Sequence, residues 1–184
     1  AVSGSVYPWV SSGGDGAYEV GQFYYSNCDT QVLGEILFRA SGQDTGLFAQ
    51  QNLFEPLSIE ADWWRDGVET GQANGNYLTY CCLDMTAQDF AKFGYMLLLG
   101  GVQTSEGKNY ASYISTILAQ EKTYQNQFWA YCDTQPFTAS AGCENVLVMT
   151  IGFDGQYILV DQKNDIVLVR NSLYEPILNF SDER

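Results

Sequence analysis

Apolar residues recur at helical spacing in the first part of the chain. Between Asp29 and Ser41 the repeat places five of them on one face, and Gly42 follows where a helix would end. These five are Val32, Leu33, Ile36, Leu37 and Ala40. The next stretch, Gln43 to Phe54, predicts a shorter helix that stops before Pro56, because a proline disfavours helical backbone in the residue before it.

A third helix is predicted to begin at Thr86. Thr86 and Asp89 resemble a capping box in which aspartate replaces the usual glutamate, so that Thr86 satisfies a free N–H at the helix start. The stripe predicted to be buried holds Phe90, Phe93, Leu97 and Leu98. Gly100 and Gly101 end this helix, and Asn109 to Gln120 predicts a further one.

The pattern changes to strands from Phe128. Three β-rich runs follow, Val146–Met149, Gln156–Val160 and Ile166–Val169. The polar residues from Gln162 to Asp165 predict a hairpin turn between the last two runs. Leu173 to Phe180 predicts a closing helix against the sheet. Trp63 to Tyr80 has little periodicity and predicts a surface loop with a short strand.

Composition narrows the class of protein. The 184 residues and 46% hydrophobic content are enough for one sizeable core. No run approaches about 18 consecutive apolar residues, so a membrane span is not expected. Eight basic and 22 acidic residues give a formal charge of −14, which argues against nucleic acid or an anionic membrane surface as a partner. The simplest consequence of this charge is solubility.

The cysteine content indicates a compartment. The five cysteines are Cys28, Cys81, Cys82, Cys132 and Cys143. Without a histidine or a Cys-x-x-Cys pair, no metal site is expected. The cysteines suggest an oxidising compartment, extracellular or periplasmic, with Cys132–Cys143 as the expected disulfide; buried free thiols are the alternative. Asn179 opens a glycosylation sequon, which is compatible with secretion.

The absence of histidine also removes whole mechanisms. A Ser-His-Asp or Cys-His site cannot be built from this chain alone, because both use an imidazole of pKa about 6.5 as the base.

Tyr25-Ser26-Asn27 resembles the Tyr-x-Asn motif of the serine β-lactamase and penicillin-binding-protein superfamily. Its surroundings are similar to one group of that superfamily, the carboxylesterases and 6-aminohexanoate-dimer hydrolases. The similar segments are Leu33 to Gln43, Phe48 to Leu57, Met85 to Leu98, and Gly152 to Gln156 with the strand after it. They stand in the family's order and cover about residues 20 to 172.

The resemblance implies an α/β (α+β) fold of the β-lactamase/transpeptidase type, in partial form. Residues 1–184 would be a single partial domain, with an irregular segment at 1–22, a mainly helical part at 23–125, and C-terminal strands and a helix at 126–184. Compared with the family, this chain is missing the N-terminal strands and the helix that carries the Ser-x-x-Lys nucleophile. We therefore expect an upstream segment or a second chain to complete the fold, since an incomplete sheet would expose an edge or an apolar face.

The resemblance also implies roles for individual residues. Tyr25 would carry the proton of the nucleophile, and Asn27 would hold a lysine or the substrate carbonyl. The alternative is that Tyr24 and Tyr25 are packed aromatic residues before a helix capped by Asn27 or Asp29.

The second predicted part of the site is Gly152 to Gln156, expected as the strand that borders the substrate cleft. Its named residues are Gly152, Phe153, Gly155 and Gln156. The N–H of Phe153 or Gly152 would form half of an oxyanion hole. Asp154 departs from relatives that carry lysine or histidine nearby, which argues against β-lactam or peptide-carboxylate recognition. The alternative is a tight strand entry that needs glycine conformations.

One Ser-x-x-Lys match, Ser105 to Lys108, is rejected as a nucleophile because it follows two glycines, contains Gly107 and lies after Tyr25.

Three hypotheses about the function remain. The chain is the C-terminal part of a secreted serine hydrolase that acts on a small ester or amide without a cofactor and is inactive alone. Alternatively, it is a catalytically dead structural or binding subunit, or its cleft binds a ligand without chemistry.

Overall fold

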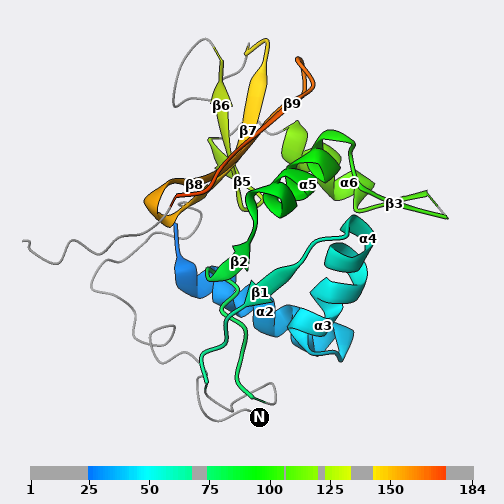
Figure 1. Cartoon of the computed structure of the whole chain (residues 1–184). Coiled ribbons are helices and arrows are strands. Elements are labelled where there is room, and N and C mark those ends of the chain that lie inside the picture. The colour runs from blue at the N-terminus through cyan, green and yellow to red at the C-terminus, as the bar shows by residue number, and fades with distance from the viewer. Residues whose placement is uncertain (1–24, 68–73, 106, 120–122, 134–142, 173–184) are drawn as a thin grey trace, which may run out of the picture. The chain divides into compact units, whose positions relative to one another are not determined.

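The computed structural model describes residues 25–67, 74–105, 107–119, 123–133 and 143–172. The chain forms two compact units (Figure 1). Unit 1 combines Ala1–Glu55 with Glu60–Asp84, and unit 2 combines Pro56–Ile59 with Met85–Arg184. The irregular segment predicted at 1–22, the closing helix predicted at Leu173 to Phe180 and the sequon at Asn179 lie outside the described residues.

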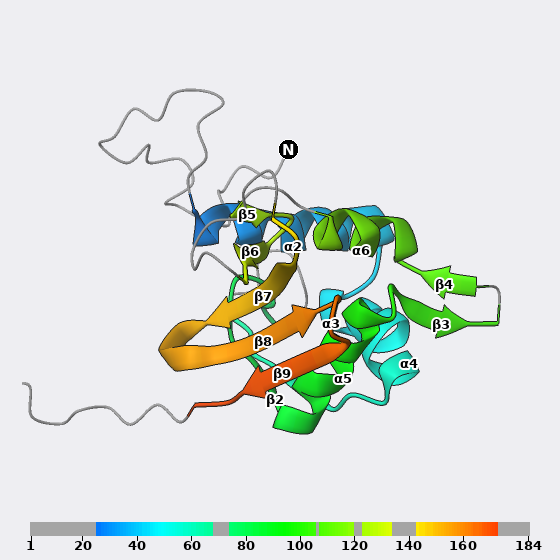
Figure 2. The same ribbon diagram turned by 90° about the horizontal axis from the view of Figure 1, so that it is seen from above.

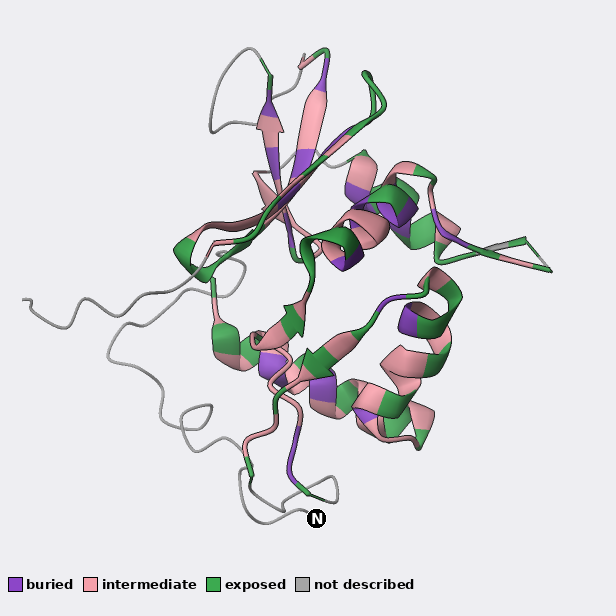
Figure 3. Ribbon diagram, in the orientation of Figure 1, coloured by how far each residue is buried: buried purple, intermediate pink, exposed green. Residues whose placement is uncertain are grey.

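Unit 1 begins with helix α2, Asn27–Ser41, which confirms the first predicted helix and starts two residues earlier than Asp29. Gly42 ends it in the left-handed conformation, with φ 66° and its N–H donating to the Phe38 carbonyl at 3.0 Å. The buried residues of α2 are Gln31 and Gly34. Leu33 and Ile36 of the predicted apolar face are 49% and 54% exposed, so that face is not buried within the described chain (Figure 3).

The buried face of α2 is polar because it binds backbone. The Gln31 amide donates to the Tyr77 carbonyl at 2.7 Å and accepts from the Thr79 N–H at 2.9 Å. The Thr79 hydroxyl donates to the carbonyl of Thr30 at 3.0 Å. Gly34 leaves the space that Thr79 fills, since a Cβ there would meet the threonine side chain. These contacts satisfy the hydrogen-bonding groups of the buried Gln31 amide, a side chain that the hydrophobic pattern alone would place on the exposed face of the helix.

The next helical stretch does not stop before Pro56. Helix α3, Thr45–Ala49, starts at Asp44, whose carboxylate accepts from the N–H groups of Gly46 and Leu47, both at 3.1 Å. A π-helical turn η1, Gln50–Phe54, and a short α4, Glu55–Leu57, follow without a break. The prediction was wrong here because the wider π turn gives the proline ring room that a regular α-helix denies it.

The rest of unit 1 is a ribbon of short pairings. Strand β1, Ala61–Trp63, pairs with β2, Leu83–Met85, and an antiparallel bridge joins Arg65 to Tyr77. The Arg65 guanidinium lies over the Tyr77 ring, 3.9 Å from its centroid, and bonds the Asp44 carboxylate at 2.8 Å. The predicted loop from Trp63 to Tyr80 is thus held by an ordered pairing where the structure describes it.

Unit 2 is built on a five-stranded antiparallel sheet in sequence order (Figure 2). Its strands are β5 Tyr124–Gln125, β6 Phe128–Cys132, β7 Val146–Gly152, β8 Gln156–Asp161 and β9 Ile166–Arg170. A separate hairpin pairs β3, Val102–Thr104, with β4, Gly107–Asn109, and helix α6 spans Ala111–Leu118. The strands predicted after Phe128 and the turn at Gln162 to Asp165 are confirmed.

Helix α5, Ala87–Leu98, covers one face of this sheet. The Thr86 hydroxyl accepts from the Asp89 N–H at 3.1 Å, which confirms the predicted cap. At the other end, Gly100 and Gly101 donate to the carbonyls of Leu97 and Met96, both at 3.0 Å, in a Schellman motif. Leu97 is buried as predicted, while Phe90, Phe93 and Leu98 are half-buried.

Gly94 sets how closely α5 approaches the sheet. A Cβ at this position would lie 2.5 Å from a Val167 methyl and 2.8 Å from an Ile158 methyl. Both neighbours are β-branched and have little rotamer freedom to move aside. We predict that Gly94→Ala lowers the free energy of unfolding by about 1–3 kcal/mol through overpacking, despite the better helix propensity of alanine.

A double-mutant cycle in urea unfolding checks this prediction. Gly94→Ala is expected to cost less in a Val167→Ala background, because the truncated valine no longer meets the new methyl. A Gly94→Ala protein more stable than the parent would contradict the close approach.

Candidate active site

The Tyr-x-Asn residues lie at the start of α2 in unit 1. The Ser26 hydroxyl accepts from the Asp29 N–H at 3.2 Å and is the N-cap of the helix. The expectation that Asn27 or Asp29 would cap the helix is therefore wrong: Asn27 is its first residue, and Asp29 supplies the N–H that is capped. Tyr25 immediately precedes the cap and is 51% exposed. Ser26 thus fixes the backbone between two exposed residues, Tyr25 and Asn27.

Gly152 to Gln156 is a turn rather than the predicted strand. Gly152 is the last residue of β7, Gln156 is the first of β8, and the 3₁₀ turn η2, Phe153–Gly155, joins them. Gly152 and Gln156 face each other across the two strands. The side chain of Phe153 is 84% exposed at the tip of this hairpin.

Both glycines of this turn have a structural reason. A Cβ on Gly152 would lie 2.8 Å from the Cβ of Gln156. Gly155 has φ 88°, and a Cβ there would lie 3.2 Å from the Arg170 guanidinium. Asp154 between them also has a positive φ of 56°, which aspartate tolerates better than most residues. A glycine conformation is therefore required at Gly155, whereas Gly152, with φ −97°, is favoured only by its close approach to Gln156.

The amide of Gln156 is engaged by the backbone. It donates to the Ser172 carbonyl at 2.5 Å and accepts from the Ser172 N–H at 2.9 Å. This side chain thereby continues the pairing of β8 with the chain beyond β9. Because both ends of the amide are hydrogen-bonded to Ser172, the geometry indicates a structural role for Gln156.

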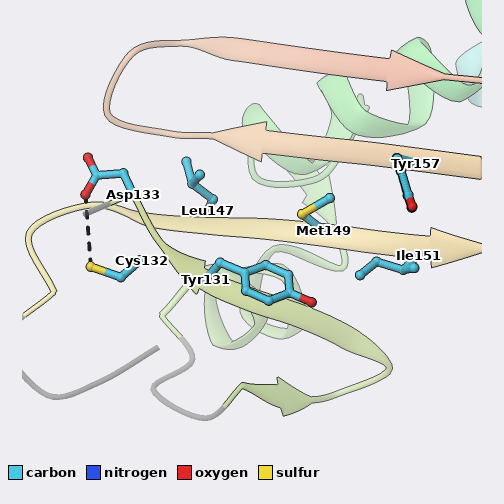
Figure 4. A pocket seen from close by; sticks show the side chains of 7 residues that line it. All are labelled: Tyr131, Cys132, Asp133, Leu147, Met149, Ile151 and Tyr157. Atoms are coloured by element: carbon cyan, nitrogen blue, oxygen red, sulfur yellow. Dashed lines mark hydrogen bonds between the residues drawn. The ribbon is translucent and has the colours of Figure 1, made fainter. Parts of the chain in front are cut away.

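Unit 2 has an apolar hollow of about 420 Å³ on the face of the sheet opposite α5 (Figure 4). It is lined by Tyr131, Cys132, Asp133, Leu147, Met149, Ile151 and Tyr157. Tyr131 lies opposite Leu147, and Ile151 opposite Tyr157, so these side chains share one face of the sheet. Burial, and then the neighbouring Tyr157, raise the pKa of Tyr131 above its ordinary value, so its phenol stays neutral near pH 7.

Comparison with known proteins gives two likenesses. A 6-aminohexanoate-dimer hydrolase of Paenarthrobacter ureafaciens is 28% identical over 175 residues, which are 86% of this chain and 41% of that protein. A solved structure from Bacillus anthracis, provisionally named a 6-aminohexanoate-dimer hydrolase, superposes with a TM-score of 0.64 at 22% identity, over 84% of this chain and 39% of that one. No protein-family profile matches the chain.

The predicted β-lactamase-related superfamily is confirmed. So is the predicted fold class, a partial β-lactamase-type arrangement of helices and antiparallel strands. The chain spans about two fifths of the length of these two relatives. Both are named as hydrolases. Among the described residues, no helix is long and apolar enough to cross a membrane.

The Ser-x-x-Lys match of this β-lactamase-related chain is not on a helix. Ser105 lies in the turn after β3, and Lys108 belongs to β4. A working motif needs the serine and the lysine one helical turn apart on the same face. The structure therefore agrees with rejecting this pair as a nucleophile.

The sulfurs of Cys132 and Cys143 lie at disulfide distance, with Cα atoms 5.7 Å apart, as predicted. Together with Asp133 they form a group of metal-ligand residue types, but sulfurs bonded to each other are not thiolate ligands. A second disulfide joins the adjacent Cys81 and Cys82. This bond was not predicted, although two neighbouring cysteines in the sequence were its signal.

The catalytic roles stay predictions. Tyr25 and Asn27 belong to unit 1, whereas the turn from Gly152 to Gln156 belongs to unit 2. Each half of the proposed site has a defined local geometry within its own unit.

The structural role of Gln156 is directly testable. We predict that Gln156→Leu lowers the free energy of unfolding by about 1–3 kcal/mol, because two hydrogen bonds to Ser172 are lost. The Ser172 amide should exchange faster with deuterium, since its acceptor is the Gln156 side chain.

Gln162→Leu is the matched control, because Gln162 is an exposed glutamine in the β8–β9 turn of the same sheet. Its effect on the free energy of unfolding should stay within about 0.5 kcal/mol. Equal effects of the two substitutions would argue against a stabilising role of the Gln156 hydrogen bonds to Ser172.

Proposed function

We propose that this chain supplies the tyrosine-bearing part of a β-lactamase-related serine hydrolase, which cleaves a small ester or amide through an acyl-enzyme. Both matched relatives are named as 6-aminohexanoate-dimer hydrolases, enzymes whose named substrate contains an amide bond. The observation that carries the proposal is the start of α2. There, an exposed tyrosine and an exposed asparagine flank the residue that caps the helix.

Tyr25 acts as the proton carrier in this proposal. Its phenolate takes the proton of a serine hydroxyl as the serine oxygen bonds to the substrate carbonyl carbon. The phenol then gives the proton to the leaving alcohol or amine as that bond breaks. Water attacks the resulting acyl-enzyme by the same route. A phenolate forms readily near neutral pH only beside a cation that stabilises its charge, so a lysine of the nucleophile motif must lie close by.

Asn27 and the β7–β8 turn take the supporting roles. The Asn27 amide would hold that lysine or the substrate carbonyl. The N–H of Phe153 or Gly152 would donate to the oxyanion that develops on the carbonyl oxygen. Asp154 adds a carboxylate to the same turn, so substrates without an anionic group there are preferred.

The nucleophile is proposed to come from a segment or a second chain outside these 184 residues. The sequence contains one Ser-x-x-Lys match, and it lies in and after the turn of a hairpin. Leu33 and Ile36 on α2, and Ile151 and Leu168 on the sheet, are exposed apolar residues of the kind that a completing segment would cover.

The alternative is a catalytically dead structural or binding subunit. The turn from Gly152 to Gln156 favours it, because both glycines and Gln156 are explained by local packing and hydrogen bonding alone. We also propose secretion to an oxidising compartment for either function. The two disulfides support this, since such bonds persist where thiols are not kept reduced.

A fluorophosphonate probe on native source material separates the two functions. Label on a Ser-x-x-Lys peptide that belongs to or co-purifies with this chain is the expected result. Full peptide coverage with neither label nor such a peptide would leave the dead-subunit function.

In the assembly that carries the labelled serine, Tyr25→Phe is predicted to lower kcat by about 10²–10⁴-fold, because it removes only the phenolic hydroxyl. Steady-state hydrolysis of a neutral ester measures this loss.

Tyr95→Phe provides the matched control, since Tyr95 is a tyrosine of α5 with a similar exposure of 55%. Its kcat should stay near that of the parent. Full activity of Tyr25→Phe would remove the tyrosine from the mechanism.

A further inference from the structure

The second disulfide joins residues adjacent in the sequence, Cys81 and Cys82, in unit 1. It lies between the segment that contacts α2 and strand β2. Cys81 and Cys82 follow Thr79-Tyr80 and precede β2. The bond closes a small ring through the peptide link between the two residues. Cys82 has φ 69°, a conformation that residues other than glycine rarely adopt. The covalent ring therefore restricts the backbone at a point where that backbone is unusual.

Two tryptophans bind the backbone of this ring. The Trp63 indole N–H donates to the carbonyls of Leu78 and Cys81, at 3.1 and 3.3 Å. The Trp64 backbone N–H donates to the Cys82 carbonyl at 3.0 Å. The ring conformation thereby fixes the path of the chain from Leu78 to β2.

The residues just before the ring, Tyr77 to Thr79, bind α2 and are called here the seat of α2. Thr79 fills the space beside Gly34, its hydroxyl bonds the Thr30 carbonyl, and its N–H bonds the Gln31 amide. The last residue of that seat, Thr79, is two positions from Cys81. The disulfide ring therefore lies two residues from the side chain and N–H that bind α2.

We propose that the Cys81–Cys82 disulfide is a redox site. It takes a dithiol reductant as its co-substrate, and its redox state controls the local stability of α2. Both cysteines are partly exposed, so a thiolate can reach them. The inference holds whether or not Tyr25 acts in catalysis, because it concerns the helix and not the reaction.

The chemistry is thiol–disulfide exchange. A thiolate of the reductant attacks one sulfur, the Cys81–Cys82 bond breaks, and a mixed disulfide forms. The second thiol of the reductant attacks that mixed disulfide and releases the protein sulfur. The reductant leaves as a disulfide, and two electrons and two protons remain on the protein as the thiols of Cys81 and Cys82.

Reduction opens the ring and lets the backbone at Cys82 leave its positive φ. The bonds to Trp63 and Trp64 then lose their fixed acceptors, and the Thr79 seat loosens. Amide exchange in α2 should become about tenfold faster, which corresponds to about 1.4 kcal/mol of lost local stability.

The test uses the Cys28→Ser chain purified without reductant, because the thiol of Cys28 lies within α2. Alkylation with mass spectrometry should find Cys81 and Cys82 blocked before dithiothreitol and modified after it. Hydrogen exchange on matched, unalkylated samples should show the faster α2 amides only after reduction.

Two variants assign the effect to the right disulfide. A Cys132→Ser/Cys143→Ser variant should keep the response to dithiothreitol. A Cys81→Ser/Cys82→Ser variant should show fast α2 exchange without it. Alkylation of Cys81 and Cys82 before reduction would overturn the proposal, and so would their reduction with unchanged α2 exchange. The measurement on the Cys28→Ser chain decides the matter if the double serine variant does not fold.

Discussion

The organisation of unit 1 depends on one buried glutamine. Gln31 faces inward from α2 and uses both ends of its amide on the backbone of a segment more than forty residues away in the sequence. A hydrophobic side chain at this position would leave the Tyr77 carbonyl and the Thr79 N–H without these partners, at a cost comparable to that of losing a buried hydrogen bond. Because α2 starts at the Tyr-x-Asn residues, the same contact determines where that candidate site stands within its unit.

This contact also explains which parts of the fold could be predicted from the sequence. Local signals were sufficient where a residue acts on its own neighbours, as in the Thr86 cap, the Gly100-Gly101 helix end and the β8–β9 turn. The buried face of α2 could not be predicted, because its polar residues are satisfied by backbone distant in sequence. The same limit applies to Gln156, whose partner Ser172 lies beyond a further strand.

Two other errors have different causes. The helix continues past Pro56 because a π turn precedes the proline, and composition gives no signal for such a turn. The segment from Gly152 to Gln156 was expected to be a strand because it resembles a strand motif of the family, whereas in this chain its two glycines and Asp154 form the connection between two strands. The residues of the candidate site were found from family resemblance, and only their local geometry comes from the structure.

The cap at Ser26 changes how the three-residue motif should be understood. Written as a pattern, Tyr-x-Asn leaves its middle position open to any side chain. In this chain that position has extended backbone itself and accepts a helical N–H, a task that serine, threonine, aspartate and asparagine perform well. Fewer residue types are therefore suitable at position 26 in this fold than the written pattern implies. A library that randomises residue 26 would be filtered by helix initiation before any selection for turnover could act.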